Sequence, residues 1–393
     1  MHKSTFRTFL LVSTVLFSLI TIISFFRFFK SFDAFKKAEV LRDIVKVPFR
    51  PINHPIIEVN GSQKFPDEPI PILVFSCNRP AALTHLVSRL LSLRGPERRE
   101  KFPIVVTQDC DDYSVKMAAS KFGTDIEYVK HNQTEVNLPP MNMHLETYYY
   151  IAQHYKSALD YIFIGKNFTS VIILEDDLTI SDDFFEYFSA TRYLLDKDPT
   201  LWCVSAWNDH GKPDLIDLEA PEKKLYRTDL MPRLGWMMTS FKKMWLQLKD
   251  IWPPSFWDDW MQYPEIRKGR QCIRPEIGRT GMSIHGQNGA SGGQFFAEHV
   301  SKNRCQQRNL SIFRRLDLNY LLNESYSQNF SRRKGKKASG KKFRIIYSDA
   351  SDFKYKLAIF GLMDDLRSGV ARTAYDGVVT CFIQGIRIFP RPK

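Results

Sequence analysis

Short apolar runs alternate with stretches of helical length between residues 71 and 205, and this alternation constrains the fold more than any other feature. Four of the runs read as buried strands, and a helix-like stretch follows each of them. Strands that alternate with helices over such a length predict an α/β fold, with a mostly parallel sheet and flanking crossover helices. The four runs are ILVFSC (72–77), PIVVTQDC (103–110), IEYV (126–129) and VIIL (171–174).

The second half of the chain differs in composition. Tryptophans and loop residues become denser after residue 200, which suits a substrate surface built beside a ligand-binding sheet. Near the C-terminus, SDFKYKLAIFGLMDD and GVVTCFIQGIRIF contain strand-like segments. We therefore expect an α/β domain over residues 70–290, followed by a region at 291–393 that includes a small C-terminal β-rich unit.

The N-terminal segment TFLLVSTVLFSLITIISFF (8–26) carries no charge and is long enough to cross the core of a bilayer. A cleaved signal peptide is the alternative, but the apolar core exceeds the usual length and no small-x-small cleavage site follows. Basic residues flank the segment on both sides, so their count alone leaves its orientation open. Because a seven-residue tail carries no domain, we expect a cytoplasmic tail at 1–7, a transmembrane signal-anchor at 8–26 and a Pro-rich stem at 27–69 before a lumenal body.

The chain is basic, with a formal net charge of +13, which is compatible with a nucleic acid, a membrane surface or a phosphorylated substrate as partner. Its most basic stretch, RRKGKKASGKK (332–342), reads as a solvated loop that could bind RNA in principle, but a lumenal position and the lack of interleaved aromatic residues lead us to expect no nucleic-acid binding. Six N-x-[ST] sequons and six cysteines without zinc-ligand spacing agree with a lumenal, oxidising compartment. The sequons are at Asn60, Asn132, Asn167, Asn309, Asn323 and Asn329.

The stretch VIILEDDL places Glu175, Asp176 and Asp177 directly after a buried strand. Ligands of open α/β sheets bind beyond the carboxyl ends of the strands, where Arg79 and Asp109 are also expected. If the strand continues through the triplet, its first and third carboxylates face one side and the second faces the other. A divalent cation and a substrate diphosphate would relieve the repulsion, whereas the alternative is a solvated acidic turn.

A second acidic pair, Asp258-Asp259, lies between Trp257 and Trp260. Partly apolar surroundings can raise the pKa of a carboxyl group, which suits a general base, and indole faces can pack on a sugar ring. The alternative is that both tryptophans belong to the core and that the aspartates cap a helix beginning at Asp259. The residues alone favour neither interpretation.

Long stretches from about Pro71 to Pro390 resemble the N-acetylglucosaminyltransferase I family. The resemblance implies a GT-A type nucleotide-sugar-binding fold in a type II Golgi membrane protein, with a lumenal catalytic domain at 70–290 and an acceptor-side region at 291–393. The family transfers N-acetylglucosamine from UDP-N-acetylglucosamine to the 2-hydroxyl of the α-1,3-linked mannose of a five-mannose N-glycan. It uses manganese and inverts the anomeric centre. The stretches are FPIVVTQDC, EDDL, DFFEYF, TLWCVSAWND, LYRTD, LGWMM, FWDDWM, RKGRQCIRPEI, GQFF and GLMDDLRSGV.

The resemblance also assigns roles to individual residues. Asp177 matches the direct manganese ligand, and Asp258 matches the general base. Residues that match or resemble contacts to the nucleotide-sugar are Arg79, Asp109, His144, Glu175, Asp176 and Ser291, and Trp257 is a further candidate substrate contact. Two disulfides are implied, Cys77–Cys110 and Cys203–Cys272; the first joins the ends of strands that the sequence already makes plausible neighbours. Cys305 and Cys381 are then left free or paired together.

The sequence departs from the family in places that leave EDDL and FWDDWM untouched. Asn78 replaces an acidic residue, and the loop at 281–293 is about two residues longer, which affects the placing of Ser291. Two alternatives remain within reach of this sequence. One is an O-mannose β-1,2-N-acetylglucosaminyltransferase, whose relative carries an additional lectin-like domain that the short stem leaves no room for. The other is a catalytically silent, membrane-anchored glycan-binding protein.

Overall fold

The structure is a computed structural model that describes residues 68–239, 241–289, 293, 295–307, 313–334, 342–383 and 386–392. The expected tail (1–7), the expected signal-anchor (8–26), nearly all of the expected stem and Ser291 lie outside these residues. Within them, no helix combines the length and the apolar character needed to cross a membrane.

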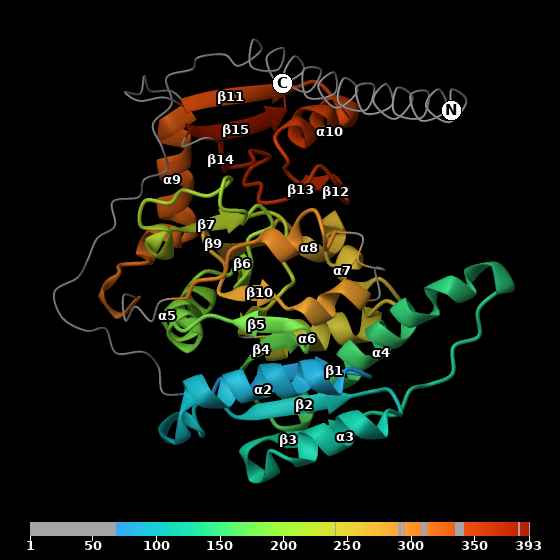
Figure 1. Cartoon of the computed structure of the whole chain (residues 1–393). Helices are drawn as coiled ribbons and strands as arrows, with labels where there is room; N and C mark the ends of the chain where they lie inside the picture. Colours follow the sequence, from blue (N-terminus) through green and yellow to red (C-terminus); the bar gives the residue numbers. More distant parts are fainter. Residues whose placement is uncertain are drawn as a thin grey trace, which may run out of the picture.

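A mixed eight-stranded sheet forms the centre of the fold (Figure 1). Its strand order is β3 (Glu127–Lys130), β2 (Ile104–Gln108), β1 (Ile72–Ser76), β4 (Ser170–Glu175), β8 (Trp236–Thr239), β6 (Leu201–Ser205), β9 (Gln271–Pro275) and β7 (Leu225–Thr228). The four strands predicted from the sequence are all present, and they form the parallel half of the sheet. The other half is mixed. Strand β8 runs antiparallel to both of its neighbours, β4 and β6, and strand β7 runs antiparallel to β9.

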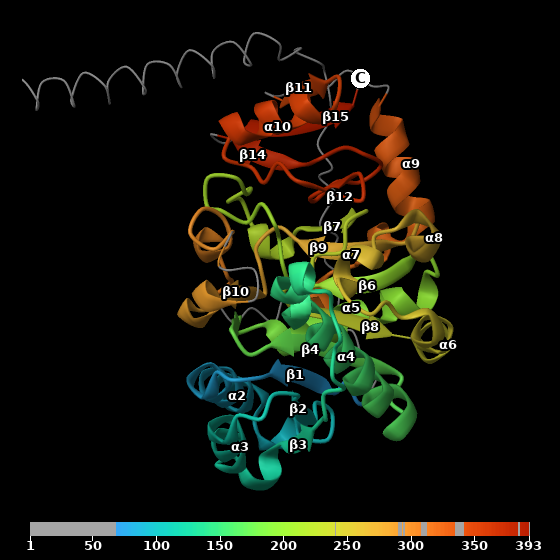
Figure 2. The same ribbon diagram turned by 90° about the vertical axis from the view of Figure 1, so that its right-hand side faces the viewer.

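Helices cover both faces of this sheet (Figure 2). One face carries α2 (Pro80–Arg94), α3 (Tyr113–Ser120) and α5 (Phe184–Lys197), and the other carries α4 (Glu146–Asp160) and α6 (Phe241–Leu248). Successive side chains of a strand point to opposite faces, so Val74 lies in the first core and its neighbours Leu73 and Phe75 lie in the second. A parallel sheet that is covered on both faces reads as continuous apolar runs, which is why these strands could be predicted.

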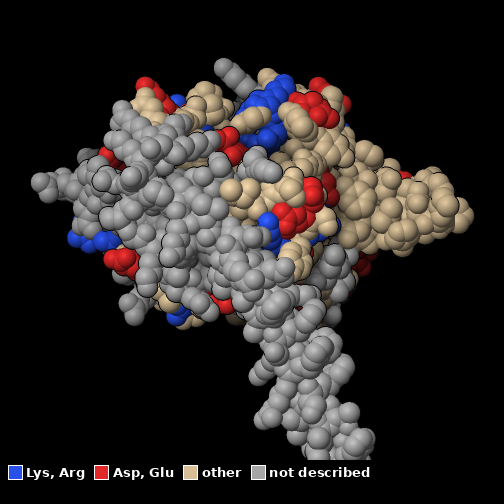
Figure 3. Space-filling model, turned by 90° about the horizontal axis from the view of Figure 1, so that it is seen from above, with Lys and Arg blue, Asp and Glu red and all other residues tan. Residues whose placement is uncertain are grey.

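The C-terminal region forms a separate unit beside this sheet, as expected (Figure 1). It consists of β11 (Lys342–Tyr347), β15 (Ile386–Pro392), β14 (Cys381–Ile383) and α10 (Ala350–Ile359), with a small core of its own around Phe353 and Leu357. The expectation of strand-like segments in SDFKYKLAIFGLMDD was wrong, because the first part of this stretch forms α10 and buries Phe353 and Leu357. A short hairpin, β12 (Leu366–Arg367) and β13 (Val370–Ala371), leads from this unit back towards the main sheet. The stretch 332–342 is not simply a loop, because α9 (Asn323–Lys334) ends within it and β11 begins at its end. On the face seen in Figure 3, the described Lys and Arg side chains lie in small groups interspersed with Asp and Glu.

Both expected disulfides are present. Cys77 and Cys110 follow the neighbouring parallel strands β1 and β2, and Cys203 and Cys272 are register partners in β6 and β9. Cys305 is a free cysteine and is not joined to Cys381. The first disulfide ties together two of the strand ends at which the sequence predicts a ligand site.

Candidate active site

The ends of β1 and β4 bring one arginine and two aspartates into direct contact. Arg79 immediately precedes α2, and its guanidinium lies 2.5 Å from Oδ1 of Asp176 and 2.9 Å from Oδ2 of Asp177. Ser76, the last residue of β1, donates a hydrogen bond from Oγ to Oδ2 of Asp176 at 2.7 Å. Both aspartates are buried, so the arginine offsets part of their mutual repulsion.

The strand does not continue through the acidic triplet. β4 ends at Glu175, the two aspartates form a turn, and β5 (Leu178–Ile180) then pairs with β10 (Thr280–Met282). Because of this turn, Asp176 and Asp177 reach the same arginine instead of facing opposite sides of the sheet. The triplet is also not a solvated acidic turn, since both aspartates are buried.

Burial raises the pKa of two carboxyl groups in the triplet. The pKa of Glu175 rises to about 7, first because of burial and then because of the charge of Asp177. The pKa of Asp176 rises to about 6 because of burial, although Arg79 and Ser76 favour its charged form. Negative charge is therefore unfavourable here in the protein alone, and a cation bound beside the triplet would stabilise it.

The oxygens of this cluster fit a hard divalent cation. Oδ2 of Asp177 accepts a hydrogen bond from Arg79, but its buried Oδ1 has no hydrogen-bond partner among the residues that the structure describes. Carboxylate oxygens suit magnesium or manganese, which keep several water and substrate ligands and need only one or two carboxylates from the protein. Asp177 is thus able to offer an oxygen to manganese while its other oxygen holds the arginine.

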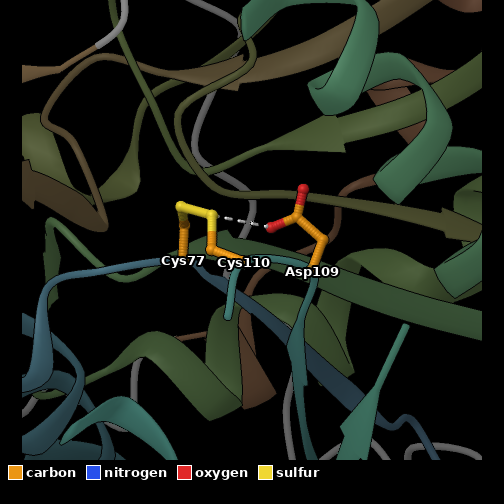
Figure 4. Close-up of side chains that lie close together, drawn as sticks. All are labelled: Cys77, Asp109 and Cys110. Atoms are coloured by element: carbon orange, nitrogen blue, oxygen red, sulfur yellow. Dashed lines mark hydrogen bonds between the residues drawn. A yellow bond between two sulfur atoms is a disulfide. The ribbon is translucent and has the colours of Figure 1, made fainter. Parts of the chain in front are cut away.

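A second group of ligand-type atoms does not fit a metal. Cys77, Asp109 and Cys110 lie at the ends of β1 and β2, with one such atom of each within 4.8 Å of the others (Figure 4). The two sulfurs form a disulfide, whereas a cysteine binds metal as a thiolate. For the same reason Cys110 Sγ has no proton to donate across its 3.5 Å contact with Asp109.

Asp109 is instead part of a hydrogen-bonded group with His154. Nδ1 of His154 lies 3.2 Å from Oδ1 of Asp109, and Gln133 donates to Oδ2 at 3.0 Å. The other ring nitrogen of His154 is 2.9 Å from Oγ1 of Thr107, so both nitrogens have partners. Burial acts to raise the pKa of Asp109, but the hydrogen bond and charge of His154 and the bond from Gln133 hold that pKa below its ordinary value.

His144 is not brought to this site. It is exposed and precedes α4, in a short 3-10 segment (Pro140–Leu145), and it lines neither of the two cavities at the strand ends. His154 lies there in its place, and the sequence analysis did not single it out. The available signal was the helical spacing of Thr147, Ile151 and His154, which puts these residues on one face of α4.

Two cavities meet at the acidic triplet. The first, of about 490 Å³, is lined by Arg79, Asp109 and His154 and by neighbouring residues of α4. The second, of about 380 Å³, is lined by Asp258 and by residues from β12 and the segment around Phe295. Glu175 and Asp177 line both, so the carboxylates stand between the two cavities. Ser291 lies outside the described residues, although Gly289 and Gly293 on either side of it line the second cavity.

Asp258 and Asp259 lie in the first turn of α7 (Trp257–Trp260), and each is paired with an arginine from a distant part of the chain. Nη1 of Arg233 lies 2.5 Å from Oδ2 of Asp258. Arg367 donates from Nη1 to both carboxylate oxygens of Asp259 at 3.1 Å. The side chain of Asp258 is 32% exposed, so it is able to meet a ligand in the second cavity. Neither aspartate caps the helix, because its N-cap is Phe256.

Trp257 belongs to the core more than to a substrate surface. It is only 4% exposed, and the rings of Tyr155, Trp236 and Trp252 lie against it, with centroids 4.2, 6.1 and 5.7 Å away. This leaves little of its indole face for packing on a sugar, contrary to one of the expectations from the sequence. Its place beneath the second cavity instead fixes the start of α7, and with it Asp258.

The raised pKa of Glu175 predicts a pH dependence of stability. A carboxyl whose pKa rises from 4.5 to about 7 on folding binds more protons in the native state, so its stabilising contribution is complete below pH 4.5 and is lost as the pH rises through 7. We expect the unfolding free energy of the metal-free wild type, relative to Glu175→Gln, to fall by on the order of 1–3 kcal/mol between about pH 4.5 and 8. Urea denaturation of both proteins at the two pH values measures this difference. A constant difference would contradict the raised pKa.

The sheet, the arginine that pairs with two buried aspartates and the paired cavities define a class of protein: an α/β protein with a ligand site beyond the carboxyl ends of its strands. The chain belongs to the GNT-I family, which matches residues 38–393. This confirms the resemblance seen in the sequence. The chain is 35% identical, over 329 residues, to the alpha-1,3-mannosyl-glycoprotein 2-beta-N-acetylglucosaminyltransferase of Arabidopsis thaliana, a match that covers 80% of this chain and 72% of the relative.

Solved structures give weaker similarities. The mannosyltransferase PcManGT from Pyrobaculum calidifontis, in complex with GDP-Man and Mn2+, matches with a TM-score of 0.36 and 14% identity, over 62% of each chain. S. aureus TarS 1-349 matches with a TM-score of 0.35 and 12% identity, over 55% of this chain and 60% of that one. This chain therefore spans less than two thirds of either solved chain.

Proposed function

We propose that this chain transfers N-acetylglucosamine from UDP-N-acetylglucosamine, in β-1,2 linkage, to the α-1,3-linked mannose of a five-mannose N-glycan on glycoproteins. Family membership and the activity named for the Arabidopsis thaliana relative support this reaction. The observation that carries the proposal is the pair of cavities that share Glu175 and Asp177, with Arg79 and Asp109 on one side and Asp258 on the other. One cavity suits a nucleotide-sugar and the other suits its acceptor.

The first cavity supplies groups for the donor. Arg79, already held by two aspartates, presents a fixed positive charge at the strand ends, where a diphosphate would lie. Asp109 and His154 position each other, and they offer a carboxylate and an imidazole to the nucleoside part. Asp177 is the residue that would hold manganese, with Glu175 beside it. When bound, the metal would neutralise the charge that develops on the departing UDP.

The second cavity supplies the base. Asp258 would accept the proton of the mannose 2-hydroxyl as that oxygen attacks the anomeric carbon, while the bond from this carbon to the UDP oxygen breaks. Attack from the face opposite UDP inverts the anomeric centre without a covalent intermediate. Arg233 lies against one oxygen of Asp258 and orients the carboxylate. Asp259 is less suited to the role, since Arg367 contacts both of its oxygens.

The proposal extends to the setting of the enzyme. We infer a single-pass type II protein of the Golgi membrane, anchored by residues 8–26, with residues 70–290 as the lumenal donor-side domain and 291–393 as the acceptor-side region. Both disulfides suit an oxidising lumen.

The test is a transfer assay with the full chain in detergent. UDP-N-acetylglucosamine, manganese and a five-mannose N-glycan should give free UDP and a glycan heavier by one N-acetylhexosamine, and EDTA should stop both. Transfer to O-linked mannose but not to the N-glycan would favour the O-mannose enzyme. Binding of the glycan without any release of UDP would favour a silent glycan-binding protein.

A further inference from the structure

Asp209 lies in the second cavity and is not explained by the reaction as proposed. It follows β6 in the loop SAWNDHG, lines the same cavity as Asp258, and is only 4% exposed. Its Oδ1 accepts a hydrogen bond from Nη1 of Arg372 at 2.8 Å. Its Oδ2 is buried and has no hydrogen-bond partner among the described residues.

A buried carboxylate oxygen without a donor is costly, and native proteins rarely leave one unsatisfied. The arrangement around Asp209 is nevertheless rigid. Asn303 donates from Nδ2 to the backbone oxygen of Asn208 at 2.8 Å, and Asn208 is itself bonded to the backbone of Glu276 at 2.7 Å. Hydrogen bonds to Asn303 and Glu276 therefore hold the loop in place, and with it Asp209, which lines the cavity.

Arg372 fixes the carboxylate itself. It donates from Nε and Nη2 to the two oxygens of Asp365, at 2.6 and 2.8 Å, as well as to Asp209. Burial acts to lower the pKa of Arg372, but the charges of Asp209 and Asp365 raise it above its ordinary value, so the guanidinium stays charged. With one oxygen of Asp209 held in this way, only the other lacks a partner among the described residues.

The surroundings indicate which ligand would fit. Each of the carboxylates Asp209, Asp258 and Asp259 already has an arginine partner, so a cation bound beside Asp209 gains little; Glu175 and Asp177 line the same cavity at the acidic triplet. A neutral molecule with hydroxyl donors satisfies the free oxygen without disturbing this balance. Apolar side chains in the same wall, among them Met231, Phe296 and Met363, can contact the carbon-bound hydrogens of a sugar ring.

We propose that Asp209 determines acceptor specificity, by accepting a hydrogen bond at Oδ2 from a mannose hydroxyl other than the one that reacts. This assignment rests on the proposed function. It gives Asp258 and Asp209 different tasks, because Asp258 takes a proton from the attacking hydroxyl and Asp209 recognises the same sugar. A site built to bond a hydroxyl rejects the analogue that lacks it, because its own buried group is then left unpaired.

Asp209→Asn is the informative variant. Its amide oxygen can still accept from Arg372, while its NH2 replaces the free acceptor with a donor. We expect kcat/KM for the acceptor to fall about 10- to 100-fold, mainly through KM, while the KM for UDP-N-acetylglucosamine stays within about twofold. Asp365→Asn is the matched control, since it also weakens the hold on Arg372 but does not line the cavity; its acceptor KM should stay close to that of the wild type.

A series of monodeoxy mannoside acceptors tests the hydrogen bond directly. Besides the reacting 2-hydroxyl, the wild type should require one further hydroxyl: it should transfer to the complete mannoside much faster than to the analogue that lacks this hydroxyl. Asp209→Asn should not distinguish these two acceptors. Equal acceptor effects in Asp209→Asn and Asp365→Asn would overturn the proposal, as would a wild type that tolerates every other deoxy position. The experiment with the wild type does not depend on whether a variant folds. A wild type that transfers to no mannoside would overturn the proposed function itself, and is therefore a distinct outcome.

Discussion

Asp258→Asn is expected to lower kcat by about 10²- to 10⁴-fold, the range that a positioned general base contributes. Asparagine keeps the size of the side chain and can still lie against Arg233, but it cannot take a proton at neutral pH. The binding of UDP-N-acetylglucosamine should change little, because Asp258 lines only the second cavity whereas Arg79 and Asp109 line the first. Steady-state kinetics and calorimetric titration with UDP separate the two effects.

Asp259→Asn is the control for this prediction. Both oxygens of Asp259 are engaged by Arg367, so its replacement should lower kcat by no more than about tenfold. Near-normal turnover by Asp258→Asn would remove Asp258 as the base. A larger loss of kcat in Asp259→Asn than in Asp258→Asn would move the role to its neighbour.

The parallel half of the fold could be predicted because its signals are local. Buried parallel strands appear as continuous apolar runs, and polar residues that follow them must meet at one edge of the sheet. This reasoning predicts Arg79, Asp109 and Asp177, and the structure places all three along one cavity. The same reasoning fails for the direction of Asp176, because a single turn after Glu175 decides it and no apolar pattern marks such a turn.

The contacts of the second cavity could not be predicted, because they join residues far apart in the sequence. Arg367 meets Asp259 across 108 positions, and Arg372 meets Asp209 across 163. Charged residues of this kind read as solvated surface until the fold brings them together. His154 was missed for a smaller reason: it lies within α4, and only the face of that helix that turns towards Asp109 decides its role, whereas His144 precedes the helix.

Asp177→Ala is expected to abolish the enhancement of UDP binding by manganese. In the wild type, UDP should bind more tightly with manganese than with EDTA, since Asp177 offers the metal an oxygen that has no other described partner. Losing a direct ligand should cost more than the 10- to 100-fold typical of groups that only support a ligand. Titration calorimetry with UDP, with and without manganese, measures the loss.

Asp182→Ala is the matched control for Asp177→Ala, because that carboxylate is partly exposed and pairs with Arg89 away from both cavities. It should leave the manganese effect unchanged. Alanine at position 177 also frees one side of Arg79, which still keeps Asp176 as a partner. A general weakening of UDP binding, with and without the metal, would therefore mean that Asp177 acts only by holding Arg79. If Asp177→Ala loses only the enhancement of UDP binding by manganese, the metal explains why three carboxylates follow one buried strand.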